Sequence, residues 1–142
     1  MKNPLIISAV LLVFLSCDIK PAKIDYGKDG CNFCSMTIVD NQHAAQIVSD
    51  KGKVKKYDAI ECMINDAKTI APENIGLILV NDFDDPGVFI DAVEAHYLIS
   101  QSIPSPMGAF LSAFKDPSVA RQVQTEQSGD LYNWETVQSV LK

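Results

Sequence analysis

The sequence predicts an α+β fold, in which two small ββα-type units pack as one domain. Stretches with strand character are followed by a stretch with helical spacing of apolar residues, and this order occurs twice along the chain. The length of 142 residues suits one domain. A chain of this size buries enough surface to fold without disulfide bonds. Its four cysteines are therefore candidates for a functional role.

The first sixteen residues resemble a bacterial lipoprotein signal peptide. Lys2 supplies a positive charge, residues 5–15 form an apolar run broken only by Ser8, and Ser16 precedes Cys17. The run is shorter than the roughly 20 residues of a membrane-spanning helix, and it has the length of a secretory signal. We predict cleavage after Ser16 and lipid attachment at Cys17. An ordinary signal peptide with an incidental cysteine is the alternative.

The lipid would hold the mature chain on a bacterial membrane, in the cell envelope and facing the periplasm. Residues 18–30 are polar and contain one proline and two glycines. They predict a tether, so that residues 17–30 form the lipidated N-terminus and residues 31–142 the folded domain.

The first unit begins with two predicted strands, residues 44–48 and 53–57. The segment Asp50-Lys51-Gly52 between them is typical of a β-hairpin turn. A helix is predicted from about Ile60, because apolar residues recur there at helical spacing.

The predicted helix has clear start and stop signals. Asp58 and Glu61 have the spacing of a capping box, in which two side chains satisfy free backbone N–H groups. The apolar spacing continues to Ala71, and Pro72 cannot continue the helix.

The second unit begins with a buried-type strand at residues 77–80, and a loop follows. Residues 88–90 and 95–100 are further strand candidates. Two prolines and a glycine in residues 101–116 predict an irregular segment around a functional loop.

Two helices complete the second unit. Asp116 is the expected N-cap of a helix that starts at Pro117 and runs to about Gln127, and Gly129 ends it. Asn133 is the expected N-cap of a short last helix over residues 134–141.

The segment from Cys31 to Met36 contains two thiols and a thioether, from Cys31, Cys34 and Met36. Polarizable sulfur ligands match Cu(I), which accepts two or three of them. A thioether adds little to Zn(II) binding, so Met36 favours copper over zinc. Met107 lies in a Pro- and Gly-rich loop, where a core-filling methionine is less expected than on a helix. These four residues are the predicted metal ligands.

Three other interpretations of the cysteines stay open. Cys31 and Cys34 could form a disulfide, since an exported protein meets an oxidising compartment. They could form a thiol–disulfide oxidoreductase site, which requires a depressed thiol pKa at a helix N-terminus. Finally, Cys31, Cys34, His43 and Cys62 could form a Cys₃His zinc site. For Cys62 alone, the helical position favours a buried core residue.

Other function classes find little support in the sequence. The net charge of -6 and the lack of a basic block disfavour nucleic acid as a partner. No nucleophile elbow, phosphate-binding loop or zinc-protease helix is present, so neither an enzyme nor a small-molecule substrate is predicted. A structural lipoprotein without a metal is a further alternative.

The chain resembles the NosL family of copper-binding lipoproteins, which accompany the assembly of nitrous oxide reductase. Members usually have glycine where this chain has Ser35. The resemblance covers almost the whole mature chain and rests on Cys34-Ser35-Met36, Ala45-Gln46-Ile47, Val80-Asn81-Asp82, Tyr97-Leu98-Ile99-Ser100, Met107-Gly108-Ala109 and Phe114.

The resemblance implies a fold of two ββα-type units, a Cu(I) site built from sulfur and delivery of copper. We therefore predict a membrane-anchored metallochaperone that binds Cu(I) and passes it to a cuproenzyme, such as nitrous oxide reductase, or to a copper-site assembly complex. Cys34 is expected to bind as a thiolate, Met36 and Met107 as thioethers, and Cys31 as an optional second thiolate.

Overall fold

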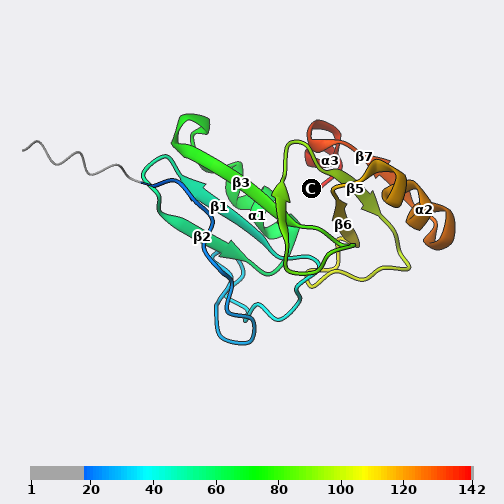
Figure 1. The fold of residues 1–142 in the computed structure, drawn as a ribbon, viewed down its shortest axis with the longest axis horizontal. Helices are drawn as coiled ribbons and strands as arrows, with labels where there is room; N and C mark the ends of the chain where they lie inside the picture. The colour runs from blue at the N-terminus through cyan, green and yellow to red at the C-terminus, as the bar shows by residue number, and fades with distance from the viewer. Residues whose placement is uncertain (1–17, 142) are drawn as a thin grey trace, which may run out of the picture.

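The computed structural model describes residues 18–141. The predicted signal peptide and Cys17 lie outside these residues. The described chain forms two antiparallel sheets with helices packed on them (Figure 1). The elements are β1 (Ala45–Ser49), β2 (Val54–Tyr57), α1 (Ile60–Ala67), the short 3₁₀ helix η1 (Pro72–Asn74), β3 (Ile75–Asn81), β4 (Phe89–Asp91), β5 (His96–Ile99), β6 (Leu111–Phe114), α2 (Pro117–Gln127), β7 (Asp130–Tyr132) and α3 (Trp134–Val140).

The first sheet has the strand order β2-β1-β3-β4. Ala45 of β1 lies opposite Tyr57 of β2 on one side and Val80 of β3 on the other. The turn after β1 places Gly52 at φ +77°, a left-handed conformation that glycine adopts without strain. The predicted hairpin of the first unit is therefore confirmed.

The second sheet has the strand order β6-β5-β7, and α2 contacts all three of its strands. In Figure 1, α2 lies on the side of this sheet away from the first sheet. The side chain of Asp116 accepts a hydrogen bond from the N–H of Ser118, and Asn133 forms a capping box with Thr136. Both predicted N-caps are confirmed.

One hydrophobic core joins the two sheets. Helix α1 contacts β1 and β2 of the first sheet and β6 of the second. Buried residues of both units belong to the same cluster, among them Ile60 and Met63 of α1 with Tyr97 and Leu111 of the second sheet. The order β1-β2-α1 and then β5-β6-α2 confirms the predicted α+β class of two ββα-type units packed together.

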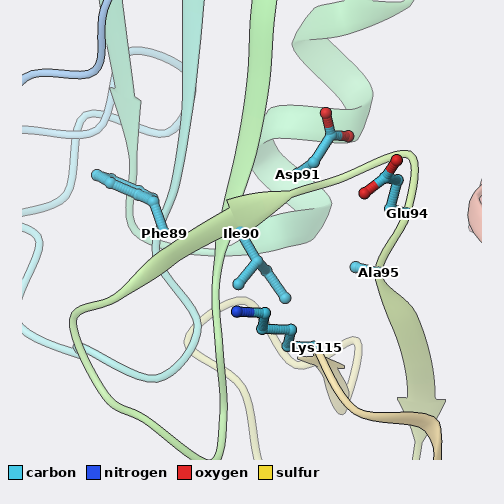
Figure 2. Close-up of a pocket in the computed structure, with 6 residues that line it drawn as sticks. All are labelled: Phe89, Ile90, Asp91, Glu94, Ala95 and Lys115. Carbon is cyan, nitrogen blue, oxygen red and sulfur yellow. The ribbon is translucent and has the colours of Figure 1, made fainter.

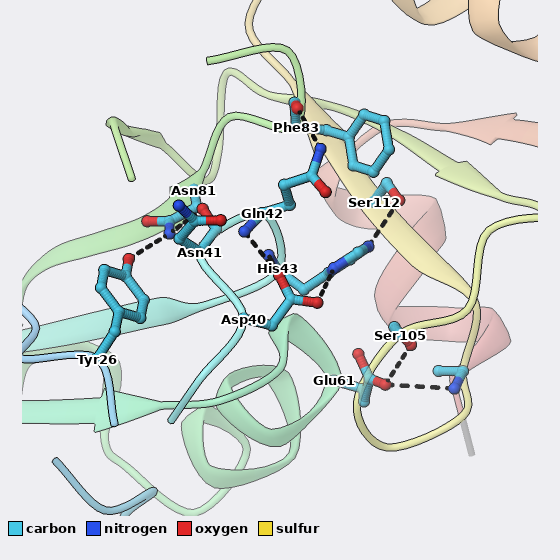
Figure 3. A network of polar contacts seen from close by, with 11 residues as sticks. Tyr26, Asp40, Asn41, Gln42, His43, Glu61, Asn81, Phe83, Ser105 and Ser112 are labelled. Atoms are coloured by element: carbon cyan, nitrogen blue, oxygen red, sulfur yellow. Dashed lines mark hydrogen bonds and ion pairs between the residues drawn. The ribbon is translucent and has the colours of Figure 1, made fainter. Parts of the chain in front are cut away.

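Polar contacts also join the two units (Figure 3). His43, which precedes β1, is buried and contacts Asp40 through Nδ1 at 2.8 Å and the Ser112 hydroxyl of β6 through Nε2 at 3.1 Å. Burial raises the pKa of Asp40, but its hydrogen bonds with His43 and with the N–H of Gln42 outweigh this and lower the pKa overall. The histidine therefore serves as a link between the units.

The predicted capping box of α1 is wrong. The N-cap residue is Ala59, and no side chain caps this end. Asp58 instead accepts a hydrogen bond from Cys34, and Glu61 accepts one from Ser105. Both carboxylates therefore accept hydrogen bonds from residues distant in sequence and do not cap the helix. The helix also ends at Ala67, earlier than the predicted Ala71.

The strand content of the second unit differs from the prediction. Residues 111–114 form β6 within a segment expected to be irregular, and β7 was not predicted. The predicted strand at residues 88–90 corresponds to β4, which pairs with β3 and so belongs to the first sheet. All four residues of β6 are buried, which removes the polar–apolar alternation that marks a half-exposed strand.

The sequence predicts a tether over residues 18–30. In the structure, residues 22–30 pack against the folded domain. Gln46 of β1 exchanges two side-chain hydrogen bonds of 2.8 Å with the backbone of Ala22, and Ile24 is buried in the core. Lys56 holds Asp29 through an ion pair of 2.6 Å. Among residues 18–141, no helix has the length and apolar character needed to cross a membrane.

Candidate metal centre

Cys31 and Cys34 lie in a tight loop closed at its base by a β-bridge between Gly30 and Thr37. Inside the bridge, the N–H of Cys31 donates to the carbonyl of Met36 over 2.8 Å, and the N–H of Ser35 donates to the carbonyl of Cys31 over 3.0 Å. Ser35 has φ +65°. These bonds bend the chain so sharply that two cysteines three positions apart can face the same point.

Asn32 fixes this loop to the edge of β2. Its N–H donates to the carbonyl of Lys56, its Oδ1 accepts from the N–H of Lys56, and both distances are 2.8 Å. Lys56 is two residues before Asp58 and four before Ile60, the first residue of α1. The loop is therefore held beside the first turn of the helix.

Asp58, two residues before α1, and Cys62, in the first turn of α1, supply two more groups. Side-chain ligand atoms of Cys31, Cys34, Asp58 and Cys62 all lie within 4.8 Å of one another. The Cys34 thiol donates to Oδ1 of Asp58 over 3.3 Å.

Three of the four residues of this sulfur cluster, as we call the group, are buried. The exposed fractions are 4% for Cys31, 1% for Cys62 and 2% for Asp58, whereas Cys34 is partly exposed. The three cysteines are free thiols. An ion that entered the cluster would therefore meet Cys34 first and become enclosed by the other three groups.

The surroundings of the cluster favour protonated thiols. Burial raises the pKa of the Cys34 thiol to about 11, Cys31 and Asp58 add to the rise, and the N–H of Met36 opposes it. Burial also raises the pKa of the Cys62 thiol, with smaller contributions from Cys31 and Asp58. A catalytic thiol–disulfide site needs a depressed pKa at a helix N-terminus. Here the pair lies in a loop, and the pKa of Cys34 is raised, which argues against the oxidoreductase alternative.

The four predicted ligands lie in different environments. Cys31 and Cys34 are brought together in the cluster. The side chains of Met36 and Met107 are exposed, with exposed fractions of 51% and 44%. Met107 lies in a loop joined to α1, because Oε1 of Glu61 accepts hydrogen bonds from the Ser105 hydroxyl and the N–H of Ala109 (Figure 3).

Sequence reasoning placed Cys62 in the core and overlooked Asp58 as a site residue. The position of Asp58 just before the predicted helix and of Cys62 in its first turn was a usable signal, since the two residues are close in sequence at the helix start. The Cys₃His zinc alternative does not fit the structure. Both ring nitrogens of His43 are engaged elsewhere, by Asp40 and Ser112.

A separate pocket lies between β4 and the segment after β6 (Figure 2). Its cavity volume is about 420 Å³. The lining contains no sulfur and combines two carboxylates with one ammonium group, which are hard groups unsuited to a soft ion. The lining residues are Phe89, Ile90, Asp91, Glu94, Ala95 and Lys115. The sulfur cluster is therefore the stronger candidate for a metal centre.

An α+β domain that gathers three thiols and a carboxylate at one largely buried point has the features of a soft-metal-binding protein. The NosL family model matches residues 21–141, and the chain belongs to the NosL family. The resemblance predicted from the sequence is thereby confirmed.

One curated protein is similar in sequence and one solved structure is similar in fold. The chain is 27% identical over 126 residues to the copper-binding lipoprotein NosL of Stutzerimonas stutzeri; the match covers 82% of this chain and 65% of that protein. The crystal structure of the copper chaperone NosL from Shewanella denitrificans has a similar fold, with a TM-score of 0.66 at 20% identity; the match covers 83% of this chain and 95% of that one. Neither relative is named for an enzymatic activity.

Proposed function

We propose that this protein is a membrane-anchored metallochaperone that binds Cu(I) and delivers it to a cuproenzyme, such as nitrous oxide reductase, or to the complex that assembles its copper site. The observation that carries the proposal is the convergence of the Cys31 and Cys34 thiols in one buried cluster. The copper-binding names of the two relatives support the choice of metal.

The donor atoms favour the monovalent ion. Thiolates and thioethers are soft ligands, and Cu(I) prefers them over the oxygen and nitrogen ligands that suit harder ions. Cys34 binds as a thiolate and Cys31 as a second one. Met36 and Met107 add thioethers at the surface. Zn(II) competes for the thiolates but gains little from the two methionines.

Exposure of part of the site suits delivery. Cys34 is partly exposed, and Met36 and Met107 are exposed. A partner protein can therefore bring its own ligands to the ion before the chaperone releases it. Thioether–copper bonds are weaker than thiolate–copper bonds, so the partner's ligands replace the thioethers first. The ion can then pass to the partner one bond at a time.

The proposed lipid on Cys17 sets the location. The signal peptide would be removed, the lipid would hold the protein on a bacterial membrane, and the domain would face the periplasm. Contacts with the domain begin close to the anchor, since Ala22 is already hydrogen-bonded to Gln46. The short spacer keeps the copper site near the membrane surface, where a membrane-bound assembly complex can reach it.

Cu(I) titration against a competing chelator under reducing conditions tests the proposal. The wild-type chain should take one equivalent of Cu(I) from the chelator. A Cys34→Ser, Met36→Leu double variant should lose this ability, whereas Met63→Leu, a change in the core of α1, should keep it. Equal uptake by the wild type and the double variant would refute copper binding at this site. Transfer to an apo-cuproenzyme, followed by its activity, tests delivery.

A further inference from the structure

Cys62 has an environment that a core-filling cysteine does not need. A cysteine in a hydrophobic core contacts apolar side chains and behaves as a small apolar residue. Cys62 belongs to the hydrophobic core, but its Sγ also lies within 4.8 Å of two other thiols and a carboxylate oxygen. These groups come from the loop at residues 31–34 and from Asp58, just before α1. Three sulfur atoms and a carboxylate oxygen at this spacing can share one metal ion.

We infer that Cys62 is a third thiolate ligand and that the protein has two sets of copper ligands that share Cys34. The inner set is Cys31, Cys34 and Cys62, which together offer three sulfur atoms to one Cu(I) ion. The outer set is Cys34 with the exposed Met36 and Met107. This inference rests on the proposed copper-binding function and adds to it a buried holding position.

The position of Cys34 supports its shared role. It is the partly exposed member of the cluster, and Met36, two residues further on, has an exposed side chain. Cys31 and Cys62 are both buried and lie on the inner side. An ion that keeps its bond to Cys34 can therefore exchange thioether ligands for thiolates as it moves inward, without ever being free in solution.

The rigidity of α1 makes Cys62 a preorganised ligand. Ile60, Met63 and Ile64 of the same helix are completely buried in the core, which fixes the direction of the Cys62 side chain. A ligand that is already held in place loses little conformational entropy on binding the ion. The inner set should therefore bind more tightly than the outer set, whose members are exposed.

The test compares Cys62→Ser with Met63→Leu in the full chain, purified in detergent and reduced. Serine keeps the size of the side chain but offers a hard oxygen. Cys62→Ser should weaken Cu(I) binding by at least about tenfold in competition with a chelator and should speed removal of copper by the chelator to a similar extent. Met63→Leu, a change of the neighbouring buried residue, should alter neither quantity beyond about twofold. Copper K-edge absorption should show three sulfur ligands in the wild type and two in Cys62→Ser.

The outcomes separate this inference from the proposed function. If Cys62→Ser binds copper like the wild type while Cys34→Ser does not, the inner set is refuted and copper binding stands. If the wild type itself fails to bind, both are refuted. If Cys62→Ser does not fold, alkylation of Cys62 in the wild type provides the test. Bound Cu(I) should protect Cys62 from alkylation in mild urea. Equal alkylation of the loaded and the metal-free protein overturns the inference.

Discussion

The thiol of Cys34 donates a hydrogen bond to the carboxylate of Asp58 over 3.3 Å. Asp58 precedes helix α1 and is buried, so its negative charge acts on the thiol with little screening by water. A thiolate formed beside this carboxylate would be repelled by it. Asp58 therefore helps to keep the proton on Cys34 in the metal-free protein.

Replacing Asp58 by asparagine should lower the pKa of Cys34. Burial is the largest cause of the raised value of about 11, and Asp58 adds to it through its hydrogen bond. An amide carries no charge, so we expect the pKa to fall by about one unit. The measurement is the pH dependence of the alkylation rate of Cys34 in the metal-free protein, followed by mass spectrometry. Asp116→Asn, which keeps a capping side chain far from the site, is the control. A pKa unchanged by Asp58→Asn would contradict the prediction.

Copper affinity should rise with pH. The pKa values of Cys34 and Cys62 are raised, so both thiols are protonated at neutral pH. If they are the proposed ligands, each must lose a proton to bind the ion. Each displaced proton strengthens the apparent affinity about tenfold per pH unit, as long as the pH is below the thiol pKa. Two such thiols give about a hundredfold per unit. Chelator competition at pH 6, 7 and 8, corrected for protonation of the chelator, measures the slope. A flat profile would show that neither thiol is displaced.

Local patterns predicted the elements that form through local contacts. The hairpin of β1 and β2, the amphipathic α1 and the capped α2 and α3 all follow from turn residues, apolar spacing and N-cap residues that lie within a few positions of each other. Strands β6 and β7 depend on pairing with β5, from which β7 is separated by α2. Their stabilising partners are distant in sequence, so local patterns gave no signal for them.

The same distinction applies to the candidate site. Cys31 and Cys34 were predicted because their spacing is local. Cys62 joins them only because Asn32 binds the backbone of Lys56 and so fixes the loop beside the start of α1. That contact spans 24 positions, and nothing in the local sequence predicts it. Asp58 was missed for a related reason, since its pattern equally suited a helix cap.

Removal of the Glu61 carboxylate should destabilise the domain. Oε1 of Glu61 accepts hydrogen bonds from the Ser105 hydroxyl and the N–H of Ala109, and Glu61→Ala leaves both donors without their acceptor. We expect a loss of about 1–3 kcal/mol in the free energy of unfolding. Urea unfolding of the metal-free protein measures it.

Two companion variants make the Glu61 prediction specific. Glu61→Gln keeps an acceptor oxygen and should cost less than Glu61→Ala. Glu126→Ala removes an exposed carboxylate on α2 and should change the free energy of unfolding by less than about 0.5 kcal/mol. Faster proteolysis within residues 104–110 in Glu61→Ala would show that the loop carrying Met107 has been released. Equal stability of the Ala variant and the wild type would mean that the loop is held by other contacts.

Ser35 should tolerate glycine and reject a β-branched residue. Its φ of +65° lies in the left-handed region, which costs most residues about 1–2 kcal/mol and a β-branched residue more. Ser35→Gly relieves this strain but gives the unfolded chain more freedom, so the free energy of unfolding should stay within about 1 kcal/mol of the wild type. Ser35→Val should lower it by about 1–2 kcal/mol and weaken Cu(I) binding, because the loop that orients Cys34 is distorted. Ser35→Ala, which lacks the branch, should fall between the two. Urea unfolding measures the free energy of unfolding, and chelator competition on the same samples measures the Cu(I) affinity. If Ser35→Val binds copper as tightly as Ser35→Gly, the conformation of Ser35 does not position Cys34.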